Sequence, residues 1–207
     1  MIRLSCSFVA SIGRFQLEDY VRELEVAVFS FDDLGQEVVV GRIAATQILW
    51  MDAEIDGERL FDICDNDSQG LFEVYRTLTN KKGKIRADLQ AYEVVDHVIF
   101  VYRIVLHPDL VFCRQAILDS VVTLFGEQSL AVMWKDTGDF TEAELAELGF
   151  CKIAGEELIF RHSSFKTPFY EAHPRGLDVD FDAMPEHAAW VEEQWFKAEK
   201  ADPQQEL

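Results

Sequence analysis

The sequence predicts a mixed α/β fold, and its second half carries the clearest signal. Residues 97–106 form a nearly continuous apolar and β-branched run, which is typical of a strand buried on both faces. Apolar residues recur at three- and four-residue spacing over 112–125, which indicates a helix, and a second buried-type strand follows at 130–134. A strand, a helical crossover and a strand form a right-handed unit, so we expect the two strands to pair in parallel.

A short helix and a returning strand extend this unit. Thr141 is followed by Glu144 and, further on, by Gly149. This arrangement matches a capping box at the start of a helix and a glycine stop at its end. The apolar stretch 153–160 then predicts the next strand of the sheet.

The first half predicts more strands. Residues 1–10 are interpreted as a first strand, and the apolar spacing over 16–24 favours a short helix. Residues 24–31 and 38–44 alternate between apolar and polar side chains, and the segment between them has turn composition. We therefore expect an antiparallel hairpin whose loop is longer than two residues.

An acidic segment at 50–91 is predicted to be an insertion. Its beginning, over 48–60, is acidic and turn-rich. Asp67 or Ser68 is a natural N-cap for a helix that ends before Gly83, with lysines near its negative C-terminal end.

The start of this helix also matches the opening of a calcium loop. Asp65, Asp67 and Gln69 occupy the first, third and fifth positions, and Gly70 occupies the sixth. The twelfth position is Arg76, where the site needs a bidentate glutamate, and a cation there repels the metal. The helix cap is therefore the preferred interpretation.

Composition excludes several classes of function. With 19 basic and 38 acidic residues, the chain carries a formal charge of −19, which repels nucleic-acid backbones and anionic lipid. The acidity leaves two interpretations, a solubilising surface or an acidic face for a basic partner.

No apolar run approaches the roughly 20 residues of a membrane helix and no secretory signal is recognisable, so we expect a cytoplasmic protein. The four cysteines lie far apart, without the spacing of a zinc site, so no metal and no structural disulfide is expected.

Residues 165–207 are interpreted as an acidic C-terminal extension of a domain that spans 1–164. Within this extension, 186–200 is predicted to be a helix with Trp190 and Trp195 close to one face. A soluble protein rarely leaves two such indoles exposed. We expect the helix to cover its own domain, and a homodimer joined through this helix is the alternative.

Two short motifs mark the ends of elements in the second half. Residues 106–108, Leu-His-Pro, close a strand before a helix, and 148–150, Leu-Gly-Phe, follow a helix before the last strand. Their order and spacing between His97 and Ser163 resemble the C-terminal half of the GNAT superfamily of acyl-CoA-dependent N-acyltransferases. The resemblance implies a mixed, mostly antiparallel sheet with a central parallel strand pair flanked by helices. It also implies transfer of an acyl group from acyl-CoA to an amine of a small molecule or a protein.

The resemblance further implies where a cofactor would bind. In that family a loop of the form Arg/Gln-x-x-Gly-x-Gly/Ala lets backbone N–H groups at a helix N-terminus approach the pyrophosphate. The matching segment here is 111–116, Val-Phe-Cys-Arg-Gln-Ala, in which only Ala116 fits. Phe112 and Arg114 stand where the inner glycines are expected, and Arg114 is expected to pair with a phosphate instead. The implied contacts to acyl-CoA or acetyl-CoA come from Ile104, Leu106, Val111, Phe112, Cys113, Arg114, Gln115 and Ala116.

Candidates for a catalytic base lie along the central strand. The family often places a proton-donating tyrosine four residues before the glycine of Leu-Gly-Phe, and this chain has Leu145 there. A base must take the proton of the ammonium group, and His107 suits this by type, although a loop hydrogen bond is the alternative role. The candidates are Glu93, Asp96, Tyr102 and His107. Two functions stay open, an N-acyltransferase and a non-catalytic GNAT-like scaffold that acts as an acidic protein-binding module.

Overall fold

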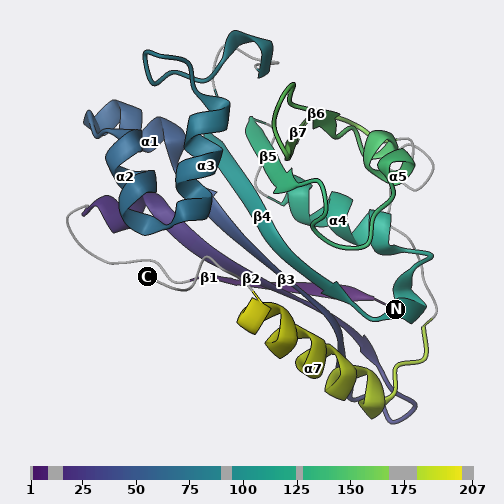
Figure 1. Cartoon of the computed structure of the whole chain (residues 1–207). Coiled ribbons are helices and arrows are strands. Elements are labelled where there is room, and N and C mark those ends of the chain that lie inside the picture. The colour runs from purple at the N-terminus through teal and green to yellow at the C-terminus, as the bar shows by residue number, and fades with distance from the viewer. Residues whose placement is uncertain (1, 9–15, 90–94, 125–127, 168–180, 202–207) are drawn as a thin grey trace.

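The computed structural model describes residues 2–8, 16–89, 95–124, 128–167 and 181–201. Within these ranges a single sheet of seven strands has the order β1-β2-β3-β4-β5-β7-β6 (Figure 1). The strands are β1 (Arg3–Phe8), β2 (Val21–Phe31), β3 (Glu37–Ile48), β4 (His97–Leu106), β5 (Ser129–Trp134), β6 (Cys151–Lys152) and β7 (Leu158–His162). The helices are α1 (Trp50–Asp56), α2 (Leu60–Asp67), α3 (Gln69–Leu78), α4 (Arg114–Thr123), α5 (Glu142–Glu147) and α7 (Pro185–Ala201). Three 3₁₀ turns join them, η1 (Leu17–Tyr20), η2 (Ala87–Leu89) and η3 (Pro108–Leu110).

The predicted fold class is confirmed. β4 and β5 run parallel, with α4 as the crossover between them, and every other pairing of the sheet is antiparallel. The hairpin of β2 and β3 has the predicted long loop, and α5 begins with the predicted capping box at Thr141. Ser68 caps α3 as expected, because its side chain accepts a hydrogen bond from the N–H of Leu71. None of the helices in the described ranges is long and apolar enough to cross a membrane.

The structure corrects three boundaries. The stretch 48–60 was expected to be irregular, but most of it forms α1 and the start of α2, because Trp50, Ala53 and Leu60 are buried in the core. The helix expected over 16–24 is only the short turn η1. Strand β2 already begins at Val21, and from Leu24 onward its buried residues alternate with less buried ones. The strand expected at 153–160 begins only at Leu158, as β7, and the two-residue strand β6 (Cys151–Lys152) precedes it.

The sheet carries one apolar core on each face. Neighbouring residues of β4 alternate between them, so Ile99 and Val101 join one core while Val98 and Phe100 join the other. The first core packs against α4 and α5, and the second packs against α1, α2 and α3. Figure 1 shows α1, α2 and α3 on the left of β4, α4 and α5 on its right, and α7 along the lower part of the sheet.

Helix α7 packs against β3 and β4 of its own chain, as expected for a helix that covers its own domain. Val191 is fully buried, and Trp190 and Trp195 are both partly buried on this chain. Phe196 of the same helix is 55% exposed. The predicted helix and the burial of its two indoles are therefore confirmed.

Gly149 gives a first prediction of stability. It follows α5 with a φ of 81°, and a Cβ at this position would collide with the Phe165 ring. We expect Gly149→Ala to lower the free energy of unfolding by about 1–3 kcal/mol, because the new side chain must adopt a left-handed conformation and displace the ring. Urea denaturation measures this loss. Gly155→Ala is the matched control, since Gly155 has a φ of 82° and open space around it; a Gly149 loss no larger than the control's would show that the ring contact is unimportant.

Candidate functional site

The parallel strands β4 and β5 diverge in the middle of the sheet. Their pairing runs from His97 opposite Ser129 to Val101 opposite Met133, whereas β4 continues to Leu106. At this point the register between β3 and β4 also shifts, so that Tyr102 is the extra residue of a bulge. Bulges bend a strand and redirect its side chains, and they are common beside functional sites.

A pocket of about 670 Å³ opens where the strands part, and we call it the divergence pocket. Its size falls within the range of small-molecule sites. It is lined by Tyr102, Arg103, Ile104, Trp134, Asp136, Thr137, Gly138, Glu157, Ala198 and Ala201. The last two belong to α7, so the C-terminal helix forms one wall of the pocket.

Arg103 places a largely buried positive charge in the wall of the divergence pocket. Its side chain is 7% exposed, and its guanidinium lies 5.0 Å from the ring centroid of Trp195 and 4.0 Å from a carboxylate oxygen of Glu199. Stacking on an indole stabilises a guanidinium in partly dehydrated surroundings. Asp136 and Glu157 add carboxylates at the rim, so the pocket offers groups of both signs on apolar walls.

The segment implied to cradle a pyrophosphate forms closed turns instead. The N–H of Leu110 donates to His107, that of Val111 to Pro108 and that of Cys113 to Leu110. These N–H groups are therefore already paired within the loop. Val111 and Phe112 are more than half exposed, whereas Cys113 is buried, so the loop turns its larger side chains outward.

The remaining residues of this segment also have partners on the protein. Arg114 Nη2 lies 2.6 Å and Nε 2.9 Å from the Glu144 carboxylate, and Gln115 donates to Glu147 at 3.0 Å. A phosphate contact by Arg114 would require breaking its bidentate bond to Glu144. Leu145, at the position implied for a proton donor, is buried in the core beside α4. Of the eight residues implied to contact the cofactor, only Ile104 lines the divergence pocket.

The candidate bases do not converge. Asp96 precedes the first residue of β4, at the opposite end from the divergence pocket, and Glu93 lies outside the described residues. Tyr102 lines the pocket and its hydroxyl donates to Glu23 at 2.9 Å. His107 follows the end of β4 and is absent from the lining.

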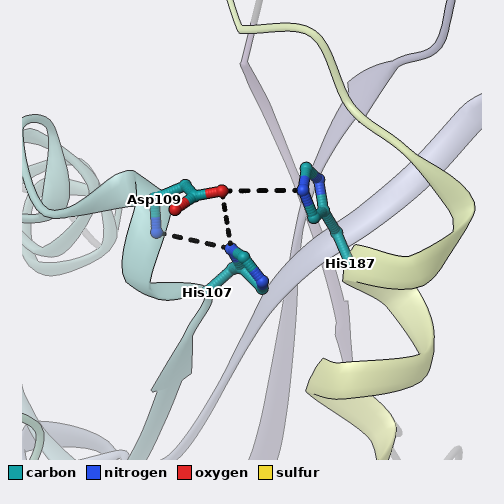
Figure 2. Close-up of side chains that lie close together, drawn as sticks. All are labelled: His107, Asp109 and His187. Carbon is teal, nitrogen blue, oxygen red and sulfur yellow. Dashed lines mark hydrogen bonds and ion pairs between the residues drawn. The ribbon is translucent and has the colours of Figure 1, made fainter.

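His107 instead belongs to a cluster with Asp109 and His187, shown in Figure 2. Its Nδ1 lies 3.5 Å from Asp109 Oδ2, and the same oxygen lies 3.7 Å from Nε2 of His187. His107 also accepts a hydrogen bond from the N–H of Asp109 at 3.3 Å, which is the loop hydrogen bond considered from the sequence. Burial lowers the pKa of His107, the neighbouring His187 lowers it further, and Asp109 acts in the opposite direction.

The sequence did not reveal this cluster or the α7 wall of the divergence pocket. His187 joins His107 only because α7 folds back along β3 and β4, and no local spacing encodes that contact. The single local signal was the pair His107 and Asp109, two residues apart beside a strand end.

The acyl-CoA contacts and the amine acceptor stay predictions. Comparison with family models, curated proteins and solved structures finds no match for this chain.

Proposed function

We propose that this protein binds a small acyl-thioester ligand of the acyl-pantetheine type in the divergence pocket and does not itself transfer the acyl group. The observation that carries this proposal is the separation of β4 from β5 after Val101, which opens a pocket of about 670 Å³ beside a bulge at Tyr102. An elongated ligand fits between two diverging strands. Arg103 can satisfy its carbonyl oxygens, while Ile104 and Trp134 contact its apolar parts.

The closed loop before α4 argues for a ligand without tightly held phosphates. Three N–H groups of the loop are paired within it, and Arg114 is held by Glu144. A charge-assisted contact to a phosphate contributes on the order of 1.5–3 kcal/mol, so two missing contacts would weaken binding by roughly a hundredfold or more. The nucleotide of acyl-CoA is therefore expected to contribute little. Leu145 offers no proton to a departing thiolate, which supports binding over transfer.

Calorimetry with two ligands tests this proposal. Acetyl-pantetheine, which lacks the nucleotide, should bind with an affinity within about threefold of acetyl-CoA, a difference of less than about 0.7 kcal/mol. Arg114→Ala should leave both affinities unchanged. Ala198→Trp should abolish binding because the new indole fills the pocket, and Ala189→Trp, on the exposed side of the same helix, is the matched control.

Four results would overturn the proposal. Acetyl-CoA binding about a hundredfold tighter than acetyl-pantetheine would show that the phosphates are held after all. Binding that persists in Ala198→Trp, or no binding of either ligand, would place the function outside the divergence pocket. Formation of an acetylated amine together with free thiol from acetyl-CoA would show that the protein is an acyltransferase.

A further inference from the structure

We propose that His107, Asp109 and His187 form a binding site for a divalent transition metal of the Zn²⁺ type. The site is independent of the ligand proposed for the divergence pocket. Two imidazoles and one carboxylate are a donor set that zinc commonly accepts from proteins, with further positions left for water. One ligand atom from each residue lies within 4.8 Å of the other two.

The distances are close to those of a bound metal. Ligand atoms placed about 2.0–2.2 Å from a tetrahedral metal are separated by about 3.3–3.6 Å from one another. Asp109 Oδ2 lies 3.5 Å from His107 Nδ1 and 3.7 Å from His187 Nε2. The Asp109 side chain is 61% exposed and can adjust, and the two ring nitrogens, which lie within 4.8 Å of each other, would move closer on binding.

The contacts around the two rings hold them in place. The rings of His107 and His187 lie 4.3 Å apart, and Trp190 packs edge-on against His107 at 5.0 Å. The ring of Phe181 lies tilted against that of His187, with 5.4 Å between the ring centroids. Side chains fixed by packing form a better metal site than mobile ones, because less freedom is lost on binding.

Metal binding would replace two weak hydrogen bonds. A metal on His107 Nδ1 takes the place of the N–H of Asp109, which donates to that atom at 3.3 Å. A metal on His187 Nε2 requires the ring proton to move to Nδ1, which then no longer accepts from the N–H of Met184 at 3.2 Å. Both are longer than the usual 2.9–3.0 Å of such bonds, so we expect their loss to oppose the metal only modestly. A metal would instead tie the first turn of α7 to the end of β4, as Figure 2 shows for the side chains involved.

Titration of the full-length protein, freed of metal by chelation, with Zn²⁺ and Co²⁺ tests the site. We expect one equivalent to bind, Co²⁺ to show the visible absorption of a tetrahedral or five-coordinate ion, and Zn²⁺ to raise the melting temperature. Asp109→Asn should weaken binding at least tenfold, because even the loss of a residue that only supports a ligand costs about 10–100-fold. His187→Asn should do the same while its side-chain oxygen still accepts from Met184. Glu186→Gln, which changes an exposed carboxylate beside the site, should have no effect.

The exposed thiols of Cys6 and Cys151 provide the main competing ligands, so the titration is repeated with both replaced by serine. Retained affinity supports the proposed site. Loss of binding in the serine variant would overturn it, as would an affinity that neither Asp109→Asn nor His187→Asn changes. Failure to bind Zn²⁺ or Co²⁺ at all would also overturn it. None of these results depends on whether acetyl-pantetheine binds.

Discussion

Asp119→Ala is expected to lower the free energy of unfolding by about 3–5 kcal/mol, because it leaves a buried guanidinium without its counter-charge. The Arg161 side chain is 0% exposed and that of Asp119 is 10% exposed, and their charged atoms lie 2.5 Å apart. Burial lowers the pKa of Arg161, and the attraction of Asp119 opposes this shift. The pair also joins β7 to α4, so its loss affects two elements of one core.

The surroundings of this pair determine which variants are informative. Arg161 Nη2 donates to the carbonyl oxygen of Phe165 at 3.0 Å, and the Thr167 hydroxyl donates to Asp119 at 3.2 Å. Replacing both charges together, with Asp119→Leu and Arg161→Met, should recover most of the loss, because a matched apolar pair needs no counter-charge. Urea denaturation of the single and double variants measures both effects.

Glu142→Ala is the control for this experiment. Glu142 also forms an ion pair from a helix, with Lys152, but both side chains are mostly exposed. Its removal should change stability very little, because water and salt screen exposed pairs. If Asp119→Ala and Glu142→Ala had similar small effects, the buried pair would contribute no more than a surface pair.

The sequence predicted those parts of the fold whose signals are local. The apolar run of β4 and the helical spacing of α4 lie next to each other in the chain, and the handedness of the crossover then leaves parallel pairing as the outcome. Thr141 and Gly149 likewise define α5 within a few residues. By contrast, α1 and α2 have acidic sequences with few periodic apolar residues. They are helical because Trp50 and Ile63 are buried against the sheet, a contact that only the whole fold provides.

The same limit explains what could be predicted of the sites. Tyr102 and Ile104 were named through the resemblance to the GNAT superfamily, which places its site along the central strand, and both line the divergence pocket. Ala198 and His187 could not be named, because each reaches its site from α7, a helix that follows residues outside the described ranges. Arg114 has the chemistry to bind phosphate, but whether a guanidinium is available depends on its neighbour, here Glu144.

Deleting residues 182–207 is expected to destabilise the protein by at least about 3 kcal/mol. Full burial of one valine contributes about 1.5–3 kcal/mol, and α7 buries Val191 completely together with most of two indoles. The helix also places acidic side chains over basic ones of the sheet, with Glu192 3.8 Å from Arg42. Its removal exposes an apolar strip of β3 and β4 and opens one wall of the divergence pocket.

Point variants on α7 test whether its buried side chains account for this stability. Val191→Ala should cost about 1–2.5 kcal/mol, because it leaves a cavity at a fully buried position, whereas Phe196→Ala should stay within about 0.5 kcal/mol because its ring is largely exposed. Size-exclusion chromatography of each variant reads the oligomeric state in parallel. Val191 and the indoles pack on their own chain, so we expect Val191→Ala to keep the oligomeric state of the full-length protein. If the 182–207 deletion changed the oligomeric state without loss of stability, α7 would instead join two copies of the chain.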